Sequence, residues 1–407
     1  MNFAFSDEQE ELRASVRRFL SEKSPETEVR RLMDTTEGYD PAVWSQMADQ
    51  LGLQSLTIPE EFGGSGFTYV ELLVVLEEMG AALLCAPFFS SVALAANALL
   101  TSGDDEAKKS YLPGIASGET IATLAITEDN GKWDFSGIEC KAAQSGDGWV
   151  LNGHKMFVLD GHVANLVIVA ARSAKGVSLF AVQGDAPGLT RAALPTMDQT
   201  RKQARLEFSD TPAVLIGADG DAAGLTRTPL PTMDQTRKQA RLEFSDTPAI
   251  LVGSDGAAEA ALSKTLDLAA VALAAEQVGG AQHVLDASVE YAKTRIQFGR
   301  PIGSFQAIKH KCADMLLEVE SAKSAAYYAG WAAAEDSDEL PVVASLAKSY
   351  CSEAYFHAAA ENIQIHGGIG FTWEHPAHLY FKRAKSSELF LGDAAYHRER
   401  LAARIGL

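Results

Sequence analysis

The sequence predicts an α+β protein in which two helical segments flank a central β domain, and three observations support this. Apolar residues recur at helical spacing from Phe5 to about residue 115. From Thr120 the period changes to two over a series of short runs. From Ala260 to the end the pattern is helical again. We therefore expect an N-terminal all-α domain (residues 1–117), a β-barrel or sandwich (118–258) and a C-terminal four-helix bundle (259–407).

Composition excludes several classes of protein. The chain has 407 residues, of which 47% are hydrophobic, so it can bury the cores of two or three domains. Its net charge of −19 argues against nucleic acids and anionic membranes as partners. No uncharged run reaches the roughly 20 residues of a membrane span, and Met1–Glu10 lacks signal-peptide features, so we expect a cytoplasmic protein. The four widely spaced cysteines predict neither disulfides nor a metal site.

The N-terminal segment predicts helices over Phe5–Leu20, Thr68–Met79 and Ser90–Leu100. Ser6, followed by Gln9, is typical of a helix start. The β domain begins after them. Its predicted strands cover Ile121–Ile126, Trp149–Asn152, Lys155–Leu159, Asn165–Ala170 and Val177–Val182.

A tandem duplication interrupts the β domain. Residues 188–223 are repeated almost verbatim as residues 224–259, an offset of 224 − 188 = 36 residues. Two units are too few for a solenoid, which needs about three or more repeats to bury a core. Because a surface insertion costs little loop-closure entropy, we expect extra strands at a sheet edge. The sequence leaves open which copy completes the domain.

The C-terminal segment predicts a bundle of antiparallel helices. Its helices are expected over Leu266–Thr294, Ala307–Ala334, Pro341–His366 and Ala394–Ile405. The small residues of Ala269–Ala275 indicate close packing against a neighbouring helix.

Two turns between these helices carry residues suited to an anionic ligand. The first runs from Arg295 to Gln306 and contains Gly-Arg-Pro-Ile-Gly. A guanidinium and an amide at its two ends suit the oxygens of a diphosphate, although a helix hairpin with solvated ends has the same pattern. The second, Gln364–Phe371, reads Gln-Ile-His-Gly-Gly-Ile-Gly-Phe, and its glycines let backbone amides approach a ligand closely.

Together these turns resemble the acyl-CoA dehydrogenase family, including actinobacterial-type members and subunits of heteromeric enzymes. The pattern Arg-x-x-Phe-Gly-x-x-Ile-x-x-Phe-Gln followed by Gln-x-x-Gly-Gly-x-Gly is more specific than a lone glycine-rich loop. The resemblance implies FAD, an acyl-CoA substrate, electron-transfer flavoprotein as oxidant, and a homo- or heterotetramer active in fatty acid or steroid degradation. It also implies that the C-terminal turns reach across a subunit interface to the ADP half of a neighbour's FAD. The implied cofactor-binding residues there are Arg295, Gln297, Phe298, Gln306, Gln364, Gly367 and Gly368.

The stretches that face the flavin ring in the family are altered in this sequence. The first keeps Thr127, but Trp133 stands at a position where the family has Ser. The second, which includes Phe157, places Leu159 where a Thr hydroxyl meets the flavin. The resemblance therefore assigns ring contacts to Thr127, Phe157 and Leu159, with backbone amides as the remaining donors at Leu159.

Both family positions for the catalytic base lack a carboxylate. α,β-Dehydrogenation of a thioester needs a base for the α proton, while the flavin N5 takes a hydride. Those positions hold Leu391 and Ala269. The nearby carboxylates are Asp393, which also suits a helix N-cap, and Glu276, which also suits an ion pair.

Three interpretations remain open from the sequence. The chain is a self-sufficient acyl-CoA dehydrogenase with a displaced base, or a base-lacking subunit that completes the FAD site of a catalytic partner. The third interpretation is a flavin-free scaffold that binds acyl-CoA. The intact diphosphate turn argues against the third.

Overall fold

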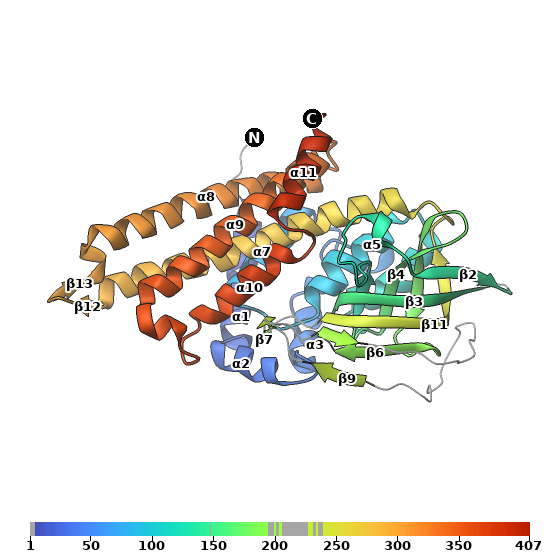
Figure 1. Cartoon of the computed structure of the whole chain (residues 1–407), viewed down its shortest axis with the longest axis horizontal. Coiled ribbons are helices and arrows are strands. Elements are labelled where there is room, and N and C mark those ends of the chain that lie inside the picture. Colours follow the sequence, from blue (N-terminus) through green and yellow to red (C-terminus); the bar gives the residue numbers. More distant parts are fainter. Residues whose placement is uncertain are drawn as a thin grey trace. The chain divides into compact units, whose positions relative to one another are not determined.

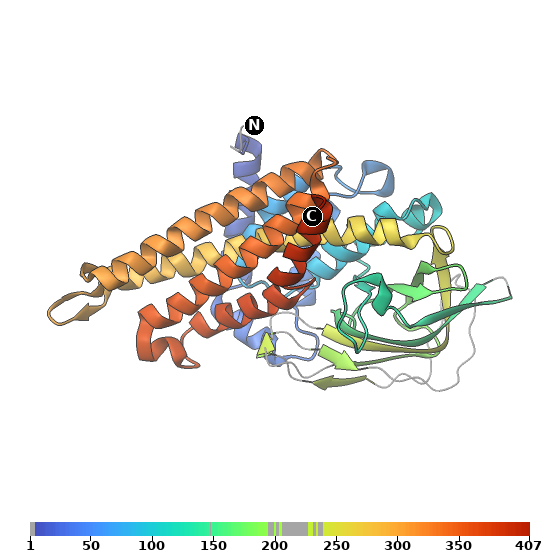
Figure 2. The same cartoon turned by 45° about the horizontal axis from the view of Figure 1, so that its top comes forward.

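The computed structural model describes residues 5–146, 148–193, 199–200, 203–205, 227–230, 233–234 and 239–407. The chain divides into two compact units, shown from two directions in Figures 1 and 2. We call Met1–Val29, Thr68–Leu84 and Asp267–Leu407 the helical unit, and Arg30–Phe67 with Cys85–Leu266 the β unit. The two units do not follow the order of the chain, because N-terminal helices belong to both of them. The predicted domain boundaries after residues 117 and 258 therefore stay a prediction.

Long antiparallel helices form most of the helical unit. The elements are α1 (Asp7–Lys23), the start of α2 (Glu26–Asp34), α4 (Tyr69–Ala81), most of α7 (Ala258–Thr294), α8 (Gln306–Ala334), α9 (Leu340–His366), α10 (Ala377–Leu389) and α11 (Ala394–Arg404). The predicted C-terminal helices are present, with α7 beginning eight residues before the expected Leu266. The predicted start of α1 is confirmed as a capping box, in which Ser6 and Gln9 each accept the other's backbone N–H.

Small residues bring α4 and α7 into close contact. A Cβ added to Gly80 would lie 2.0 Å from the carbonyl oxygen of Glu276, and one added to Gly279 would lie 1.8 Å from that of Glu77. Ala269, Ala272 and the neighbouring alanines of α7 are buried. The prediction of close helix packing for this alanine-rich stretch is therefore confirmed.

The β unit opens with short helices. They are α3 (Pro41–Asp49), the 3₁₀ turns η1 (Leu53–Ser55) and η2 (Glu60–Phe62), the π-helical segment η3 (Phe89–Ala96), α5 (Asn97–Thr101) and α6 (Asp105–Ala116), with the turn η4 (Phe135–Gly137) among the strands. The helix predicted over Ser90–Leu100 is present as η3 continuing into α5.

The described strands of the β unit are β1 (Ala122–Ala125), β2 (Lys141–Ser145), β3 (Gly148–Leu159), β4 (Leu166–Arg172), β5 (Val177–Gln183), β6 (Leu189–Ala193), β7 (Gln199–Thr200), β8 (Gln203–Arg205), β9 (Arg227–Leu230), β10 (Met233–Asp234) and β11 (Gln239–Val252). Strands β7 and β10 pair with each other in a small sheet of their own, and the others belong to one sheet. Pairing runs from β4 through β2, β3, β11 and β5 and returns to β4, which confirms the predicted barrel. The runs predicted at Trp149 and Lys155 form one strand, β3.

Both copies of the duplication contribute strands to this sheet. Strand β6 comes from the first copy and β11 from the second, and they pair antiparallel with Arg241 opposite Ala192. Strand β11 also pairs with β3 and β5, so the second copy contributes the closing strand. The short strands β8 and β9 lie beyond β6 at the end of the sheet, where extra strands were predicted.

Candidate functional site

The Arg295–Gln306 turn is a short hairpin between α7 and α8. Two-residue strands β12 (Ile296–Gln297) and β13 (Arg300–Pro301) pair antiparallel, and the 3₁₀ turn η5 (Ile302–Ser304) leads into α8. The backbone of Arg295 accepts a hydrogen bond from Ile302 at 2.8 Å, which fixes the base of the hairpin. The predicted ligand side chains Arg295, Gln297 and Gln306 are exposed.

The tip of this hairpin places an aromatic ring in solvent. Phe298 is 91% exposed and has φ of +52°, a left-handed conformation that is uncommon outside glycine. Its ring lies edge-on to Phe305, and the Arg300 guanidinium lies 4.2 Å above the Phe305 ring. An exposed aromatic in an unfavourable backbone conformation indicates a contact surface.

The hairpin is also a basic patch in an acidic chain. Residues 291–312 contain five Lys and Arg residues and no Asp or Glu, whereas the chain carries a net charge of −19. This local excess of positive charge favours an anionic ligand against the field of the whole molecule.

The second turn exposes backbone next to two glycines. Helix α9 ends at His366, and the 3₁₀ turn η6 (Gly367–Phe371) follows. Gly367 has φ of +65°, and a Cβ added to Gly367 or Gly368 would meet nothing within 4 Å. The Gln364 side chain, on the last turn of α9, is exposed. A ligand can therefore approach this backbone directly.

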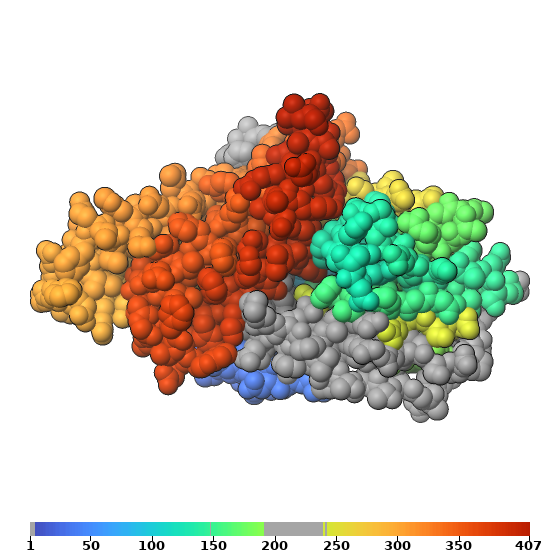
Figure 3. All heavy atoms as spheres, viewed as in Figure 1, coloured from blue at the N-terminus to red at the C-terminus, as the bar shows by residue number. Residues whose placement is uncertain are grey.

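Ring stacking and an ion pair bring the two turns to the same end of the helical unit. The ring of Tyr291, one helical turn before Arg295, stacks on His366 with centroids 4.2 Å apart. Lys311 at the start of α8 pairs with Glu361 near the end of α9. Both turns lie at the surface (Figures 1 and 3). Burial lowers the pKa of His366, so this ring stays neutral at pH 7.

The chemistry of these groups fits a dinucleotide diphosphate. The turns offer a planar guanidinium, side-chain amides and open backbone beside glycine, all of which hold phosphate oxygens. Arg295, Gln306, Gln364 and the two glycines would therefore hold the diphosphate of a flavin dinucleotide. Their assignment to this role remains a prediction.

The predicted ring-side residues lie in the β unit. The Thr127 hydroxyl donates to the carbonyl oxygen of Met156 at 2.6 Å, and the Met156 N–H donates to that of Thr127 at 2.8 Å. Phe157, the next residue, has φ of +58° and is 37% exposed. Leu159 is buried, and its carbonyl oxygen accepts from the Thr123 hydroxyl at 2.6 Å.

A buried ion pair holds these two segments together. Lys155 is fully buried, and its Nζ lies 2.7 Å from Glu128 Oε1 and 2.8 Å from the carbonyl oxygen of Ile126. Glu128 also accepts the backbone N–H groups of Glu139 and Cys140 at 2.9 Å each. The segments that carry Thr127 and Phe157 are therefore fixed relative to each other.

Neither residue at the two predicted base positions can take up a proton. Leu391 is 4% exposed and has φ of +63°, and Ala269 is fully buried on α7. The two nearby carboxylates have structural contacts. Asp393 caps α11 by accepting the N–H of Tyr396 at 2.8 Å, and Glu276 forms a buried ion pair with Arg383 at 2.9 Å.

Two buried donors hold the turn that carries Leu391, and sequence reasoning did not identify them. Lys348 is fully buried on α9 and donates to the carbonyl oxygens of Glu388 at 3.1 Å and Gly392 at 3.0 Å. His397 Nε2 donates to the carbonyl oxygen of Leu391 at 3.0 Å. Burial, with Lys348 nearby, lowers the pKa of His397 to about 3. In the sequence, a lysine among the small and apolar residues of α9 could have indicated the buried position of Lys348.

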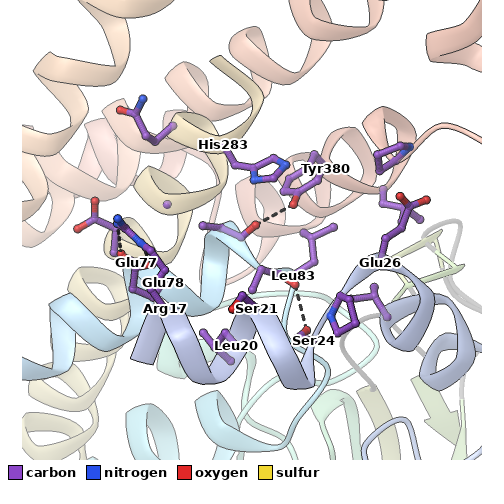
Figure 4. A pocket seen from close by; sticks show the side chains of 18 of the residues that line it. Arg17, Leu20, Ser21, Ser24, Glu26, Glu77, Glu78, Leu83, His283 and Tyr380 are labelled. Atoms are coloured by element: carbon purple, nitrogen blue, oxygen red, sulfur yellow. Dashed lines mark hydrogen bonds and ion pairs between the residues drawn. The ribbon is translucent and has the colours of Figure 1, made fainter. Parts of the chain in front are cut away.

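A separate cavity of about 620 Å³ opens in the helical unit (Figure 4). Residues of α1, α4, α7 and α10 and the start of α2 line it. His283 and Tyr380 stack along one side at 4.4 Å, and the Tyr380 hydroxyl donates to the carbonyl oxygen of Ala81 at 2.7 Å. The predicted cofactor and base residues lie elsewhere.

The described residues lack two further features. No helix in the described part of the chain is long and apolar enough to span a membrane. The same part of the chain contains no cluster of His, Cys, Asp and Glu side chains that would hold a metal ion.

Comparison with known proteins places the chain in a family. Family models match it as the acyl-CoA dehydrogenase N-terminal domain (residues 6–119), middle domain (123–211) and C-terminal domain (259–406). The acyl-CoA dehydrogenase IpdE2 of Mycolicibacterium smegmatis is 34% identical over 98% of this chain and 99% of its own length.

Two solved structures of paired proteins have the same fold. The Tcur3481-Tcur3483 steroid acyl-CoA dehydrogenase variant matches with a TM-score of 0.80 and 29% identity over 98% of both chains. The ChsE4-ChsE5 complex from Mycobacterium tuberculosis matches with a TM-score of 0.82 and 27% identity over 100% of this chain and 99% of its own. With all three family domains matched in order and an intact glycine turn and Arg-Gln hairpin, the chain belongs to the acyl-CoA dehydrogenase family of flavin-dependent oxidoreductases.

Proposed function

We propose that this chain is the base-lacking subunit of a heteromeric acyl-CoA dehydrogenase. Its C-terminal turns hold the ADP half of an FAD whose ring lies on a catalytic partner with the same fold. The single observation that carries the proposal is the contrast between the two halves of the site. Arg295, Gln306 and the Gly367–Gly368 backbone are exposed, whereas Leu391 and Ala269 leave the base positions without a carboxylate.

The two carboxylates closest in sequence do not replace the base. A base must be within reach of the substrate α carbon and able to exchange its proton. Glu276 is 3% exposed and paired with a buried guanidinium, so protonating it would remove the carboxylate charge that Arg383 contacts at 2.9 Å. The Asp393 carboxylate already accepts a backbone N–H in the first turn of α11. The base therefore comes from the partner chain.

The ring-side surface supports the same assignment. The Thr127 hydroxyl is already a donor to Met156, and Leu159 has no hydroxyl. A bound flavin would supply the hydride acceptor for the β hydrogen, and this chain's residues would position the dinucleotide. The two paired relatives have names that describe two-component assemblies, and one of them is a steroid enzyme.

We infer that the substrate is a bulky acyl-CoA ester, that electrons leave to electron-transfer flavoprotein, and that the assembly is a cytoplasmic heterotetramer. Family membership and the paired relatives support these assignments. FAD rather than FMN is proposed because the basic hairpin and the glycine turn suit a diphosphate, which FMN lacks.

The test is to purify the chain alone and with a co-expressed homologous partner, and to record flavin absorbance and acyl-CoA oxidation. We expect a colourless, inactive chain alone, and a yellow, active complex that FAD reconstitutes and FMN does not. A yellow and active homomer would refute the partner-subunit role.

A matched pair of variants locates the contribution of this chain. Arg295→Gln in this subunit should lower the flavin content of the complex at least about ten-fold, as expected for a lost charge-assisted contact. Arg300→Gln is the control, because its guanidinium lies over Phe305 on the same hairpin. Equal flavin content in the two variants would contradict the assignment of Arg295.

A further inference from the structure

A second exposed apolar surface lies on the glycine turn and just after it. Ile369, Phe371 and Trp373 are 48%, 75% and 60% exposed, within five residues of chain. Large apolar side chains grouped in this way mark a contact with a ligand or partner. Of the three, Trp373 offers the largest planar surface.

The indole of Trp373 is held in place by its neighbours. The Lys382 ammonium lies 4.2 Å from the ring centroid, and the His378 ring contacts it edge-on at 4.8 Å. His378 Nε2 also donates to the carbonyl oxygen of Trp373 at 3.4 Å. Because Trp373 remains 60% exposed despite these contacts, its side chain is open to a further planar group. A fixed ring loses little entropy when it binds one.

Ring contacts connect the segment that carries this indole to the diphosphate groups. Tyr291 stacks on His366, and the centroid of the His366 ring lies 4.4 Å from that of His375, which is two residues after Trp373 in the chain. Tyr291 is one turn before Arg295, so the indole and the guanidinium border the same end of the helical unit.

We propose that Trp373, with Lys382 beside it, is the residue on which the adenine of the bound dinucleotide stacks. Every nucleobase presents a planar face to an aromatic side chain, and a cation next to the ring suits the adjoining ribose and phosphate. The inference rests on the proposed function, since it adds a base contact to the diphosphate contacts assigned there.

The experiment uses ADP as the probe at about 10 mM, because half of a site is expected to bind weakly. Saturation transfer from the protein to adenine H2 and H8 reports contact with the base, and ³¹P shifts report contact with the diphosphate. The proteins are wild type, Trp373→Ala, Trp373→Phe and Arg295→Gln. Phe371→Ala is the matched control, as it removes an exposed ring from the same turn.

We expect Trp373→Ala to weaken ADP binding at least about five-fold, the lower end of what base stacking contributes, and to abolish saturation of H2 and H8. Trp373→Phe and Phe371→Ala should stay within about two-fold of wild type. Inorganic pyrophosphate should bind Trp373→Ala as it binds wild type.

Two results would overturn the inference while leaving the proposed function standing. One is unchanged H2 and H8 saturation in Trp373→Ala when Arg295→Gln removes the ³¹P shifts. The other is a Trp373→Ala chain that binds ADP normally but no longer assembles with its partner, which would make the indole a protein contact. Absence of any ³¹P shift with wild type would instead refute the proposed function.

Discussion

At the scale of single residues, the buried pair Glu276–Arg383 shows why a carboxylate close in sequence to a predicted base position need not be catalytic. Both side chains are at most 4% exposed, and Arg383 also contacts the carbonyl oxygen of Leu84 at 3.5 Å. An ion pair in such surroundings is costly to break, because the remaining charge stays buried. Glu276 therefore contributes to the stability of the helical unit.

Replacing Glu276 with Gln should lower the free energy of unfolding by about 3–5 kcal/mol, measured by chemical denaturation. Glu353→Gln is the control, since Glu353 pairs with Arg398 at the surface and both side chains are about half exposed. That variant should change stability by about 0–1 kcal/mol. Similar losses in the two variants would show that burial does not set the cost.

His397 predicts a pH dependence with a defined sign. Its pKa is lowered to about 3 in the folded chain, whereas an unfolded His titrates near 6.5. Between these values the unfolded state binds a proton that the folded state does not, so this contribution to stability is lost as pH falls below about 6.5.

The measurement is the difference in unfolding free energy between wild type and His397→Gln as a function of pH. We expect the advantage of wild type to shrink by about 1.4 kcal/mol per pH unit between about pH 6 and pH 4. An NMR titration of His397 with a midpoint near 6.5 would contradict this.

At the scale of elements, the turn after α9 has two glycines with different roles. Gly367 needs its positive φ of +65° to end the helix. Gly368 has no such requirement, and a Cβ there would meet nothing within 4 Å. Glycine at 368 is therefore unexplained by the fold and consistent with space for a ligand.

Gly368→Ala should leave the melting temperature unchanged while weakening flavin retention by the complex roughly ten-fold, because a methyl group would block backbone approach. Gly148→Ala is the matched control, since its Cβ would have a nearest neighbour at 3.9 Å and its φ is also outside the left-handed region. A Gly368→Ala complex that keeps its flavin would exclude this backbone from the site.

At the scale of the whole molecule, the barrel should need only one of the two copies of the duplicated segment. Strand β11 pairs with β3, β5 and β6, which lie outside residues 203–238, and only its first two residues also pair with β8 inside that segment. The sequence Thr-Arg-Lys stands immediately before that segment, at 200–202, and again as its last three residues, at 236–238. Removing it joins Lys202 to Gln239 and restores a single copy.

A chain lacking residues 203–238 should fold, with a melting temperature within about 4 °C of the full chain, as expected for a change of no more than about 1 kcal/mol in a chain of this size. Differential scanning calorimetry and a check of solubility would test this. Aggregation of the shortened chain would show that the edge strands β8 and β9 are needed to cover the sheet.

The sequence by itself determined the class of fold and the chemistry of the turns. Helical and two-residue periods are local, so they predicted α7 to α9 and the barrel strands, and the spacing of Arg295, Gln306 and Gly367 indicated a family. The sequence also showed which positions lack a carboxylate.

Only the tertiary structure decided what the remaining groups do. It paired Glu276 with Arg383, buried Lys348 beneath the Leu391 turn, closed the barrel with a strand from the second copy, and set Trp373 among fixed rings. Each of these depends on residues far apart in the chain that meet by packing. No local pattern encodes which of them will be neighbours, because the burial that gives a charge or a ring its role is a property of the assembled fold.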